Sequence, residues 1–471
     1  MRSPYFPART VLFHKEPNGV TYRVPALLYL FRSRCFLAFC EERLSPSDSQ
    51  AHLLVMRKGT FYRNYVEWED MHVLGTALLP GYRSMNPTPV YDDFTGTLFL
   101  FFIAVLGHTS ESYQLVTGKN VTHLCFICST DDGETWSPVT DLTKNVIGDT
   151  IKEWATFALG PGHGVQLKSG RLLIPAYAYH ISRKECFGQL CQTTPHAFCF
   201  YSDTHGRTWR FGEAIRGPQS VECQMVSVDE EDGTNVLYCN ARSPLGYRVQ
   251  ALSLDDGLVF QEGQLVQRLV EPGNGCHGSI VGFPAPLNSR HSLENRSCKP
   301  VYRCRHWTPG MACSYNTSPS SDIITNLSSN HIAPPDFLTP TWVVYSHPTW
   351  NTARKDLGVF LSPFPRDPDS WRGPWVIYEG PSAYSDLAYL ELSPSPGAPP
   401  AVAFACLFEC GSRTAYDEIC FCIFTLYELF DNLPHDQVPE TSWRQDVQTA
   451  PVSRRGKQRK KNKLTEVCSV A

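Results

Sequence analysis

The sequence has no apolar run long enough to cross a membrane as a helix. The longest candidate, residues 98–106, is far shorter than the roughly 18 residues that a bilayer requires, and its length suits a buried strand. The start of the chain also lacks the apolar core of roughly 7–15 residues that marks a signal peptide. We therefore expect neither a transmembrane helix nor entry into the secretory pathway.

A strong charge bias is also absent. The chain of 471 residues carries 42 Lys and Arg against 46 Asp and Glu, a formal net charge of -4. This balance gives no sign of a nucleic-acid partner. Charged residues make up 19% and apolar residues 42% of the chain, which is typical of a folded core and not of a disordered protein.

The 18 cysteines show no disulfide framework in their spacing. We expect most of them to be reduced and to pack as small buried residues. Cys186 and Cys191 are the pair closest to metal-ligand spacing, but no second pair follows to complete a zinc site. The sequence therefore predicts no metal ion and no cofactor. Outside the secretory pathway the Asn-x-Ser/Thr sequons would stay unmodified; they begin at Asn120, Asn295, Asn316 and Asn326.

Helical periodicity is scarce, and short runs rich in Val, Ile, Phe, Tyr and Leu recur in its place. Turn residues such as Asp-Gly, Pro-Gly and Asn-Pro separate these runs, which predicts an all-β sandwich, barrel or propeller. The predicted strands cover residues 26–30, 35–40, 52–57, 97–103, 123–129, 171–179, 196–202, 236–240, 342–345 and 419–425.

A repeat favours the propeller. Residues 129–136 fit the pattern Ser-x-Asp-x-Gly-x-Thr-Trp at every fixed position, and residues 202–209 and 253–260 fit it with substitutions. This pattern is the Asp-box, a hairpin-turn motif of propeller blades, in which the Asp accepts backbone N–H groups and the Gly adopts a conformation that other residues avoid. Three copies indicate a propeller. We interpret Asp131 and Asp255 as structural residues, in preference to catalytic ones.

The spacing of the predicted strands gives the expected domain boundaries. One β domain should occupy residues 1–430, interrupted at about 286–340 by a Ser/Asn/Pro-rich surface insertion without periodicity. A polar, basic tail follows over residues 431–471.

Several motifs carry a resemblance to a known family. Tyr22-Arg23-Val24-Pro25 precedes the first Asp-box, as in the vertebrate sialidases, and the likeness extends over residues 8–430. Within that family the resemblance is strongest to the fourth branch. It is carried by residues 9–13, 102–109, 240–245 and 278–286. The resemblance implies a six-bladed β-propeller and exo-α-sialidase activity.

The resemblance also implies a carboxylate-binding site. Sialic acid carries a carboxylate on its anomeric carbon, and the planar guanidinium of arginine binds such a group with two parallel hydrogen bonds. The positions that match the three arginines of the family are Arg23, Arg242 and Arg354. Glu409 matches a carboxylate that orients the first of them.

The catalytic groups implied by the resemblance are Tyr384, Glu222 and Asp48. A carboxylate nucleophile would be repelled by the carboxylate of the sugar, whereas a neutral phenol is not, although its high pKa requires a base. Tyr384 matches the nucleophile and Glu222 its base. Asp48, placed in a loop, matches the general acid/base, and since it must be protonated in the first step we expect an acidic optimum.

Further positions match substrate-recognition residues. Arg43, Met85 and Asn86 would face the 4-hydroxyl and N-acetyl side of the sugar, and Tyr177 and Tyr179 the glycerol and aglycone side. Core packing is the alternative for the tyrosine pair and Met85. Glu111 and Gln114 are expected in a loop that closes over the sugar.

The expected function is hydrolysis of terminal sialic acids from gangliosides, glycoproteins and oligosaccharides, with retention. Two alternatives belong to other classes. A propeller that only binds sialylated glycans would keep the arginines and lose the catalytic groups, all of which are present. An Asp-box sorting or adhesion receptor would show a signal peptide, a membrane helix and disulfides.

The basic tail leaves three interpretations open. Residues 454–463 carry seven Lys or Arg and fit a nuclear localisation signal loosely, which would make the import machinery a partner. The final Cys468-Ser-Val-Ala471 fits a prenylation motif in part, and prenylation beside a basic run would give peripheral membrane association at the cytoplasmic face. The third interpretation is a disordered tail without a specific role. We favour the nucleus.

Overall fold

The computed structural model describes residues 5–62, 65–184, 190–286, 339–392 and 401–434. The chain divides into two units, and apart from Pro286 the described residues all belong to the first, Met1–Ala285 with His306–Val438. The predicted insertion and basic tail lie outside the described residues except at their margins. Within the described ranges, no helix has both the length and the apolar character needed to span a membrane.

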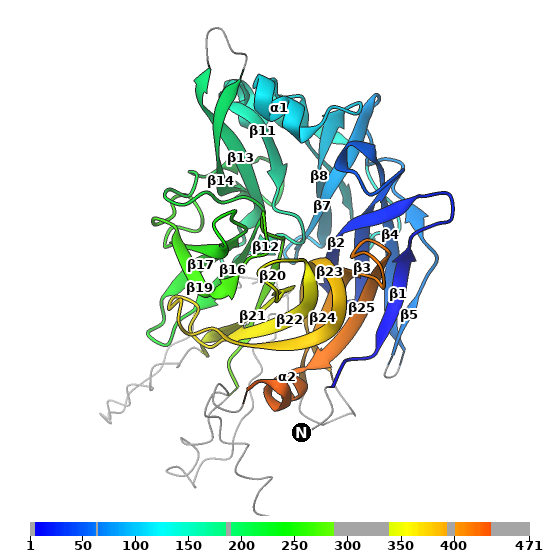
Figure 1. The fold of residues 1–471 in the computed structure, drawn as a ribbon, viewed down its shortest axis with the longest axis vertical. Coiled ribbons are helices and arrows are strands. Elements are labelled where there is room, and N and C mark those ends of the chain that lie inside the picture. The colour runs from blue at the N-terminus through cyan, green and yellow to red at the C-terminus, as the bar shows by residue number, and fades with distance from the viewer. Residues whose placement is uncertain (1–4, 63–64, 185–189, 287–338, 393–400, 435–471) are drawn as a thin grey trace, which may run out of the picture. The chain divides into compact units, whose positions relative to one another are not determined.

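The first unit is built almost entirely of β-strands (Figure 1). All ten segments predicted as strands coincide with or overlap observed strands, so that prediction is confirmed. The strands are β1 (Arg9–His14), β2 (Thr21–Leu30), β3 (Cys35–Arg43), β4 (Ala51–Tyr62), β5 (Tyr65–Trp68), β6 (His72–Val73), β7 (Tyr82–Asp92), β8 (Thr97–Leu106), β9 (Thr122–Ser129), β10 (Thr140–Asp141), β11 (Trp154–Leu159), β12 (Val165–Gln166), β13 (Leu172–Lys184), β14 (Cys191–Ser202), β15 (Arg210–Phe211), β16 (Cys223–Asp229), β17 (Asn235–Ala241), β18 (Tyr247–Ser253), β19 (Gln264–Val270), β20 (Ser279–Pro284), β21 (Thr341–Pro348), β22 (Lys355–Ser362), β23 (Arg372–Leu392), β24 (Ala401–Cys410) and β25 (Glu418–Thr425).

Short helical segments lie between the strands or after the last of them, and they were not predicted. They are η1 (Asp48–Gln50), α1 (Glu111–Thr117), η2 (Thr143–Ile147), η3 (Gly148–Glu153) and α2 (Leu426–Asn432). Each is too short to reveal a helical period in the sequence.

The strands form antiparallel sheets that follow one another in chain order. Four of them are meanders: β2-β3-β4-β5, β7-β8-β9-β10, β11-β13-β14-β15 and β16-β17-β18-β19. The last sheet has seven strands in the order β1-β25-β24-β23-β22-β21-β20, so that β1 pairs with β25 from the other end of the chain. Figure 1 shows these two strands side by side. The arrangement is all-β and propeller-like.

The core lies between neighbouring sheets, and β8 shows how the sequence specifies this. Both of its faces are covered, so almost every residue is apolar. Phe99, Phe101 and Ile103 pack in the cluster shared with β11 and β13. The alternate residues, including Leu100 and Phe102, pack in the cluster shared with β2 and β3. The longest apolar run of the sequence is thus a strand buried on both sides.

The three repeat segments form turns with one hydrogen-bond pattern. In the first, the Asp131 carboxylate accepts the backbone N–H of Thr135 at 2.9 Å, and Gly133 has a φ of 87°. In the third, Asp255 accepts from Val259 at 2.9 Å. In the second, the Thr204 hydroxyl accepts from Thr208 at 2.8 Å and replaces the carboxylate.

Candidate active site

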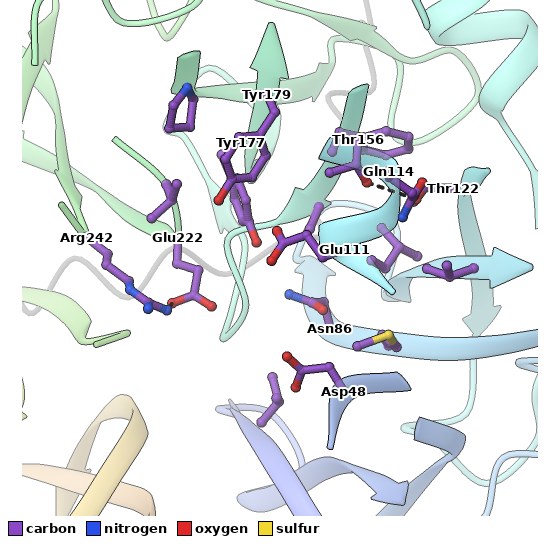
Figure 2. Close-up of a pocket in the computed structure, with 18 of the residues that line it drawn as sticks. Asp48, Asn86, Glu111, Gln114, Thr122, Thr156, Tyr177, Tyr179, Glu222 and Arg242 are labelled. Atoms are coloured by element: carbon purple, nitrogen blue, oxygen red, sulfur yellow. Dashed lines mark hydrogen bonds and ion pairs between the residues drawn. The ribbon is translucent and has the colours of Figure 1, made fainter. Parts of the chain in front are cut away.

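One cavity of about 730 Å³ brings together side chains from several sheets and from α1. Figure 2 shows the carboxyl groups of Asp48, Glu111 and Glu222 pointing into the same space from different sides. Every residue that the sequence assigned to catalysis or substrate binding lines this cavity, with the exception of Glu409. The lining ones are Arg23, Arg43, Asp48, Met85, Asn86, Glu111, Gln114, Tyr177, Tyr179, Glu222, Arg242, Arg354 and Tyr384.

Tyr384 and Glu222 are in direct contact. Tyr384 lies in β23 and its hydroxyl donates a short hydrogen bond to Oε1 of Glu222, which precedes β16. Nη1 of Arg242 donates to Oε2 of Glu222 at 2.7 Å and to the Tyr384 hydroxyl at 3.0 Å. Tyr384 and Glu222 are both buried, 7% and 6% exposed, so this contact is largely shielded from water.

The surroundings fix the proton on the phenol in the free protein. Burial opposes the charge of Glu222, but Arg242, His277 and the Tyr384 hydroxyl outweigh it and lower the pKa of Glu222 to about 2. Burial and the Glu222 charge raise the pKa of Tyr384 well above its usual value, although Arg242 and Arg354 act in the opposite direction. Glu222 is therefore an anionic acceptor and Tyr384 a neutral donor.

Arg23 is held by Glu409, as the resemblance implied. Its Nε donates to Oε1 of Glu409 at 2.7 Å, and both side chains are buried. The same carboxylate accepts the backbone N–H of Val24 at 2.9 Å and that of Tyr384 at 3.1 Å. Glu409 therefore fixes an arginine and the backbone of the nucleophile candidate from behind the cavity wall.

Arg354 completes a group of three arginines around one tyrosine. Its guanidinium donates to the Tyr416 hydroxyl at 3.3 Å and to the Gly275 carbonyl at 3.1 Å. Its Cζ lies 5.3 Å from the centre of the Tyr384 ring, and that of Arg23 lies 5.6 Å from it. The three cationic groups thus converge beside one phenol.

Asp48 lies across the cavity from Glu222 and Arg242 (Figure 2), in the three-residue segment η1 within the loop between β3 and β4. Its side chain is 70% exposed and accepts from Nη1 of Arg43 at 2.5 Å. Arg43 is buried and is also paired with Glu41, 2.6 Å away. Arg83 donates to the Asp48 carbonyl at 3.2 Å.

Glu41 and Arg83 were not identified from the sequence. Glu41 accepts the backbone N–H of Asn86 at 2.7 Å, which ties β3 to β7. A signal was present for Glu41, because alternation along a strand puts residues 41 and 43 on one face. Arg83 also donates to the carbonyls of Gly107 and Thr109, at 2.6 and 2.7 Å, which supports the segment before α1.

Glu111 and Gln114 lie in helix α1, so their predicted placement in a loop is wrong. Ser110 caps the start by accepting from Tyr113, and Gly118, with a φ of 64°, ends the helix. The pKa of Glu111 is raised to about 7. The largest cause is desolvation of the carboxyl group by the cavity walls, although the residue is exposed at the surface, and the negative charges of Glu222 and Asp48 add to it.

Gln114 has a structural role in this arrangement. Its Oε1 accepts from the Val121 backbone at 2.8 Å and from the Thr122 hydroxyl at 3.2 Å. These bonds attach α1 to the start of β9.

The remaining predicted residues are Met85, Asn86, Tyr177 and Tyr179, which also line the cavity. Asn86 has a φ of 55° and donates from Nδ2 to the Leu159 carbonyl at 3.0 Å. Met85 is buried beside Asn86 and packs in a core cluster while also lining the cavity. Tyr177 and Tyr179 of β13 meet edge to face at 6.1 Å (Figure 2).

One group in the described ranges could offer metal ligands. Cys410, Glu418 and Cys420 have ligand atoms within 4.8 Å of one another, on β24 and β25. None of the three lines the cavity. Of the cysteine pair considered from the sequence, Cys186 lies outside the described residues and Cys191 is a free thiol.

Comparison with known proteins points to one family. A family model described as "BNR repeat-like domain" matches residues 36–281. Sialidase-4 of Mus musculus is 49% identical over 461 residues, which cover 91% of this chain and 95% of the relative. Sialidase-3 of Homo sapiens is 42% identical over 427 residues, covering 90% and 94%.

Solved structures share the fold at low identity. "Hadza microbial sialidase Hz136" superposes with a TM-score of 0.63 at 20% identity, over 89% of this chain and 69% of that one. "Trypanosoma rangeli sialidase" does so with a TM-score of 0.57 at 14% identity, over 90% and 60%. The structural likeness therefore supports the propeller-like fold.

Proposed function

The chain belongs to the sialidase family and is an exo-α-sialidase, and on this premise we propose that it acts with retention through a covalent intermediate on Tyr384. The observation that carries the proposal is the buried contact of the Tyr384 hydroxyl with Glu222. An acceptor for the phenolic proton is already in place where three arginines converge.

The arginines account for the choice of nucleophile. Arg23, Arg242 and Arg354 would bind the sugar carboxylate, each charge-assisted hydrogen bond contributing about 1.5–3 kcal/mol. That carboxylate would repel an anionic nucleophile at the adjacent anomeric carbon. A neutral tyrosine that loses its proton only during attack avoids this repulsion.

The first chemical step joins the two sides of the cavity. The Tyr384 oxygen forms a bond to the anomeric carbon while its proton passes to Glu222. The bond from that carbon to the leaving oxygen breaks, and Asp48 protonates the oxygen. In the second step Asp48 takes a proton from water, which attacks the anomeric carbon and releases Tyr384, and Glu222 returns the proton. Two inversions give retention.

Substrate binding itself would make Glu222 a better base. In the free protein Arg242 is the first of the groups that lower the pKa of Glu222. A bound carboxylate would offset part of that positive field, and the pKa of Glu222 would rise towards its ordinary value. The proton transfer is thereby favoured only when the sugar is in place.

The opposite wall would recognise the rest of the sugar. We propose that Arg43 and Asn86 bind polar groups on the 4-hydroxyl and N-acetyl side and that Met85 contributes apolar contact. Tyr177 and Tyr179 would face the glycerol and aglycone side. In Figure 2, Glu111 lies between this tyrosine pair and Asp48.

We also propose that the fold has six blades and that the three repeat turns are Asp-boxes. Support comes from β23, whose residues 372–381 pair with β22 while residues 382–392 pair with β24. The seven-stranded sheet would then be two blades that share one long strand, the second of them completed by β1.

The decisive test uses a fluorogenic sialoside with the wild type and the Tyr384→Phe variant. Sialidase action through Tyr384 requires turnover by the first and a large loss in the second. Equal turnover would overturn the nucleophile assignment. Binding of sialosides without any turnover by the wild type would favour the alternative, a sialoglycan-binding propeller.

Sialylated glycoconjugates are the substrates, and we propose that gangliosides, glycoproteins and oligosaccharides are all included. We further propose that residues 454–463, outside the described ranges, direct the protein to the nucleus. Loss of nuclear fluorescence on deleting these residues from a fluorescent fusion would support this. Loss of membrane staining on Cys468→Ser would favour a prenyl anchor in its place.

A further inference from the structure

Of the three arginines beside Tyr384, Arg242 and Arg354 are held by the backbone of one turn, residues 272–276. The carbonyl of Asn274 accepts hydrogen bonds from Nε and Nη2 of Arg242, at 3.0 and 2.7 Å. The carbonyl of the next residue, Gly275, accepts from Nη2 of Arg354 at 3.1 Å. The orientation of both guanidinium groups therefore depends on two successive carbonyl oxygens.

The turn has a left-handed backbone at the two residues whose carbonyls bind the arginines. Asn274 and Gly275 both lie in the left-handed region, with φ of 64° and 71°. Glycine and asparagine adopt this region at the least cost, so the sequence of the turn suits its backbone. A Cβ on residue 275 would come within 2.8 Å of Cγ of Arg242, so the turn and the arginine are in close contact.

Glu271 binds the end of this turn from behind the cavity. Its side chain is buried and does not line the cavity. Oε2 accepts the backbone N–H of Cys276 at 2.9 Å, and Oε1 accepts that of Ser243 at 3.2 Å. One carboxylate thus connects the residue that follows Arg242 to the residue that follows Gly275.

Two further side chains fix the carboxylate. Nη1 of Arg248 donates to Oε1 of Glu271 at 3.0 Å and to the Cys276 carbonyl at 2.8 Å. Nε2 of His347 lies 3.0 Å from Oε2 of Glu271. Burial acts to raise the pKa of Glu271, but Arg248 and His347 outweigh it and the pKa is lowered. Glu271 is therefore a charged and fully engaged group.

We propose that Glu271 is a positioning residue, which holds the 272–276 turn so that the carbonyls of Asn274 and Gly275 aim Arg242 and Arg354 at the substrate carboxylate. The inference rests on the proposed role of these two arginines. A residue outside the cavity thus contributes to the affinity for anionic ligands.

The test is a double-mutant cycle between Glu271→Gln and Arg242→Ala. The readout is the Kd of an unsaturated sialic acid analogue that carries the carboxylate, measured by calorimetry on the full chain. Glu271→Gln should weaken binding about tenfold in the wild-type background and less than about threefold in the Arg242→Ala background. An equal loss in both backgrounds, or none in the wild type, would overturn the inference.

Asp92→Asn is the matched control. Asp92 is also a buried carboxylate paired with a histidine, 2.9 Å from His205, but it does not line the cavity or contact the turn. Its replacement should change the melting temperature and leave the Kd unchanged. If Glu271→Gln does not fold, Glu271→Asp keeps the buried charge and draws the carboxylate back from the turn by one methylene, and the same expectation applies to it.

The outcomes separate this inference from the proposed function. If Arg242→Ala binds the analogue as tightly as the wild type, the proposed role of the arginine fails. If Arg242→Ala loses affinity and Glu271→Gln does not, only the positioning role of Glu271 fails.

Discussion

The hydroxyl of Tyr384 donates to the carboxylate of Glu222, a residue 162 positions away in the chain. The strand β23 carries the first and the entry to β16 carries the second, so only the closure of successive sheets around the cavity brings them together. Arg242 bonds to both and directly follows β17. Acceptor, donor and cation are therefore assembled before any substrate arrives.

Replacing Tyr384 by Phe removes the oxygen that would attack the anomeric carbon. We expect kcat on a fluorogenic sialoside to fall on the order of 10³-fold or more, as for other nucleophile deletions. Tyr378→Phe is the matched control, because Tyr378 lies in the same strand and its hydroxyl donates to the Gly411 carbonyl, outside the cavity. That variant should retain a kcat close to the wild-type value.

Replacing Glu222 by Gln should change how stability depends on pH. The pKa of Glu222 in the folded protein, about 2, is lower than the ordinary value of 4.5, so its stabilising contribution is present above about pH 4.5 and is lost as the pH falls towards 2. Since the group is buried, the difference corresponds to about 3 kcal/mol. Urea unfolding at several pH values should show a smaller decrease in the variant than in the wild type across this window. Parallel curves would contradict the pKa shift.

The sequence was sufficient to predict the strands and the residues that surround the cavity, for different physical reasons. Strands buried on two faces, such as β8, are apolar along nearly their whole length, and this local pattern is visible in the sequence. Arg23, Glu222 and Tyr384 were identified through motif resemblance, because nothing in their immediate neighbours encodes contact with residues far along the chain.

Other features could not be predicted in this way. Helix α1 has only seven residues and depends on caps at Ser110 and Gly118. Arg83 and Glu271 are held in large part by backbone groups, the carbonyls of Gly107 and Thr109 for the first and the amides of Ser243 and Cys276 for the second. Such groups are the same in every residue, so the sequence carries no pattern that identifies the partner.

Glu111 should make ligand binding depend on pH near neutrality. Its pKa is raised to about 7, so the carboxyl is mostly neutral below that pH and becomes anionic above it. An additional negative charge in the cavity opposes an anionic sugar, and the Kd of a sialic acid analogue should increase as the pH rises from about 6 to about 8. Glu111→Gln should remove this increase. An identical pH dependence in both proteins would assign the effect to another group.

Replacing Glu409 by Ala should destabilise the fold as well as the site. Glu409 is fully buried and accepts hydrogen bonds from Arg23 and from the backbone of Val24 and Tyr384. Removing one partner of a buried ion pair leaves the other charge uncompensated, which costs about 3–5 kcal/mol. Denaturant unfolding should show a loss of this size. Glu391→Ala, at an exposed position near the end of β23, should cost less than about 1 kcal/mol.

Replacing Asp48 by Asn should affect substrates according to their leaving group. Asn has nearly the same shape as Asp and can still accept from Arg43, so the η1 segment should remain in place, but it cannot give a proton to the leaving oxygen. An aryl leaving group departs as a stabilised anion and needs little protonation, whereas a sugar alcohol needs it. We therefore expect kcat/KM to fall about 10²–10⁴-fold for a sialyl-lactose substrate and considerably less for an aryl sialoside. Equal losses on both substrates would show that Asp48 acts through the shape of the site and not as the proton donor.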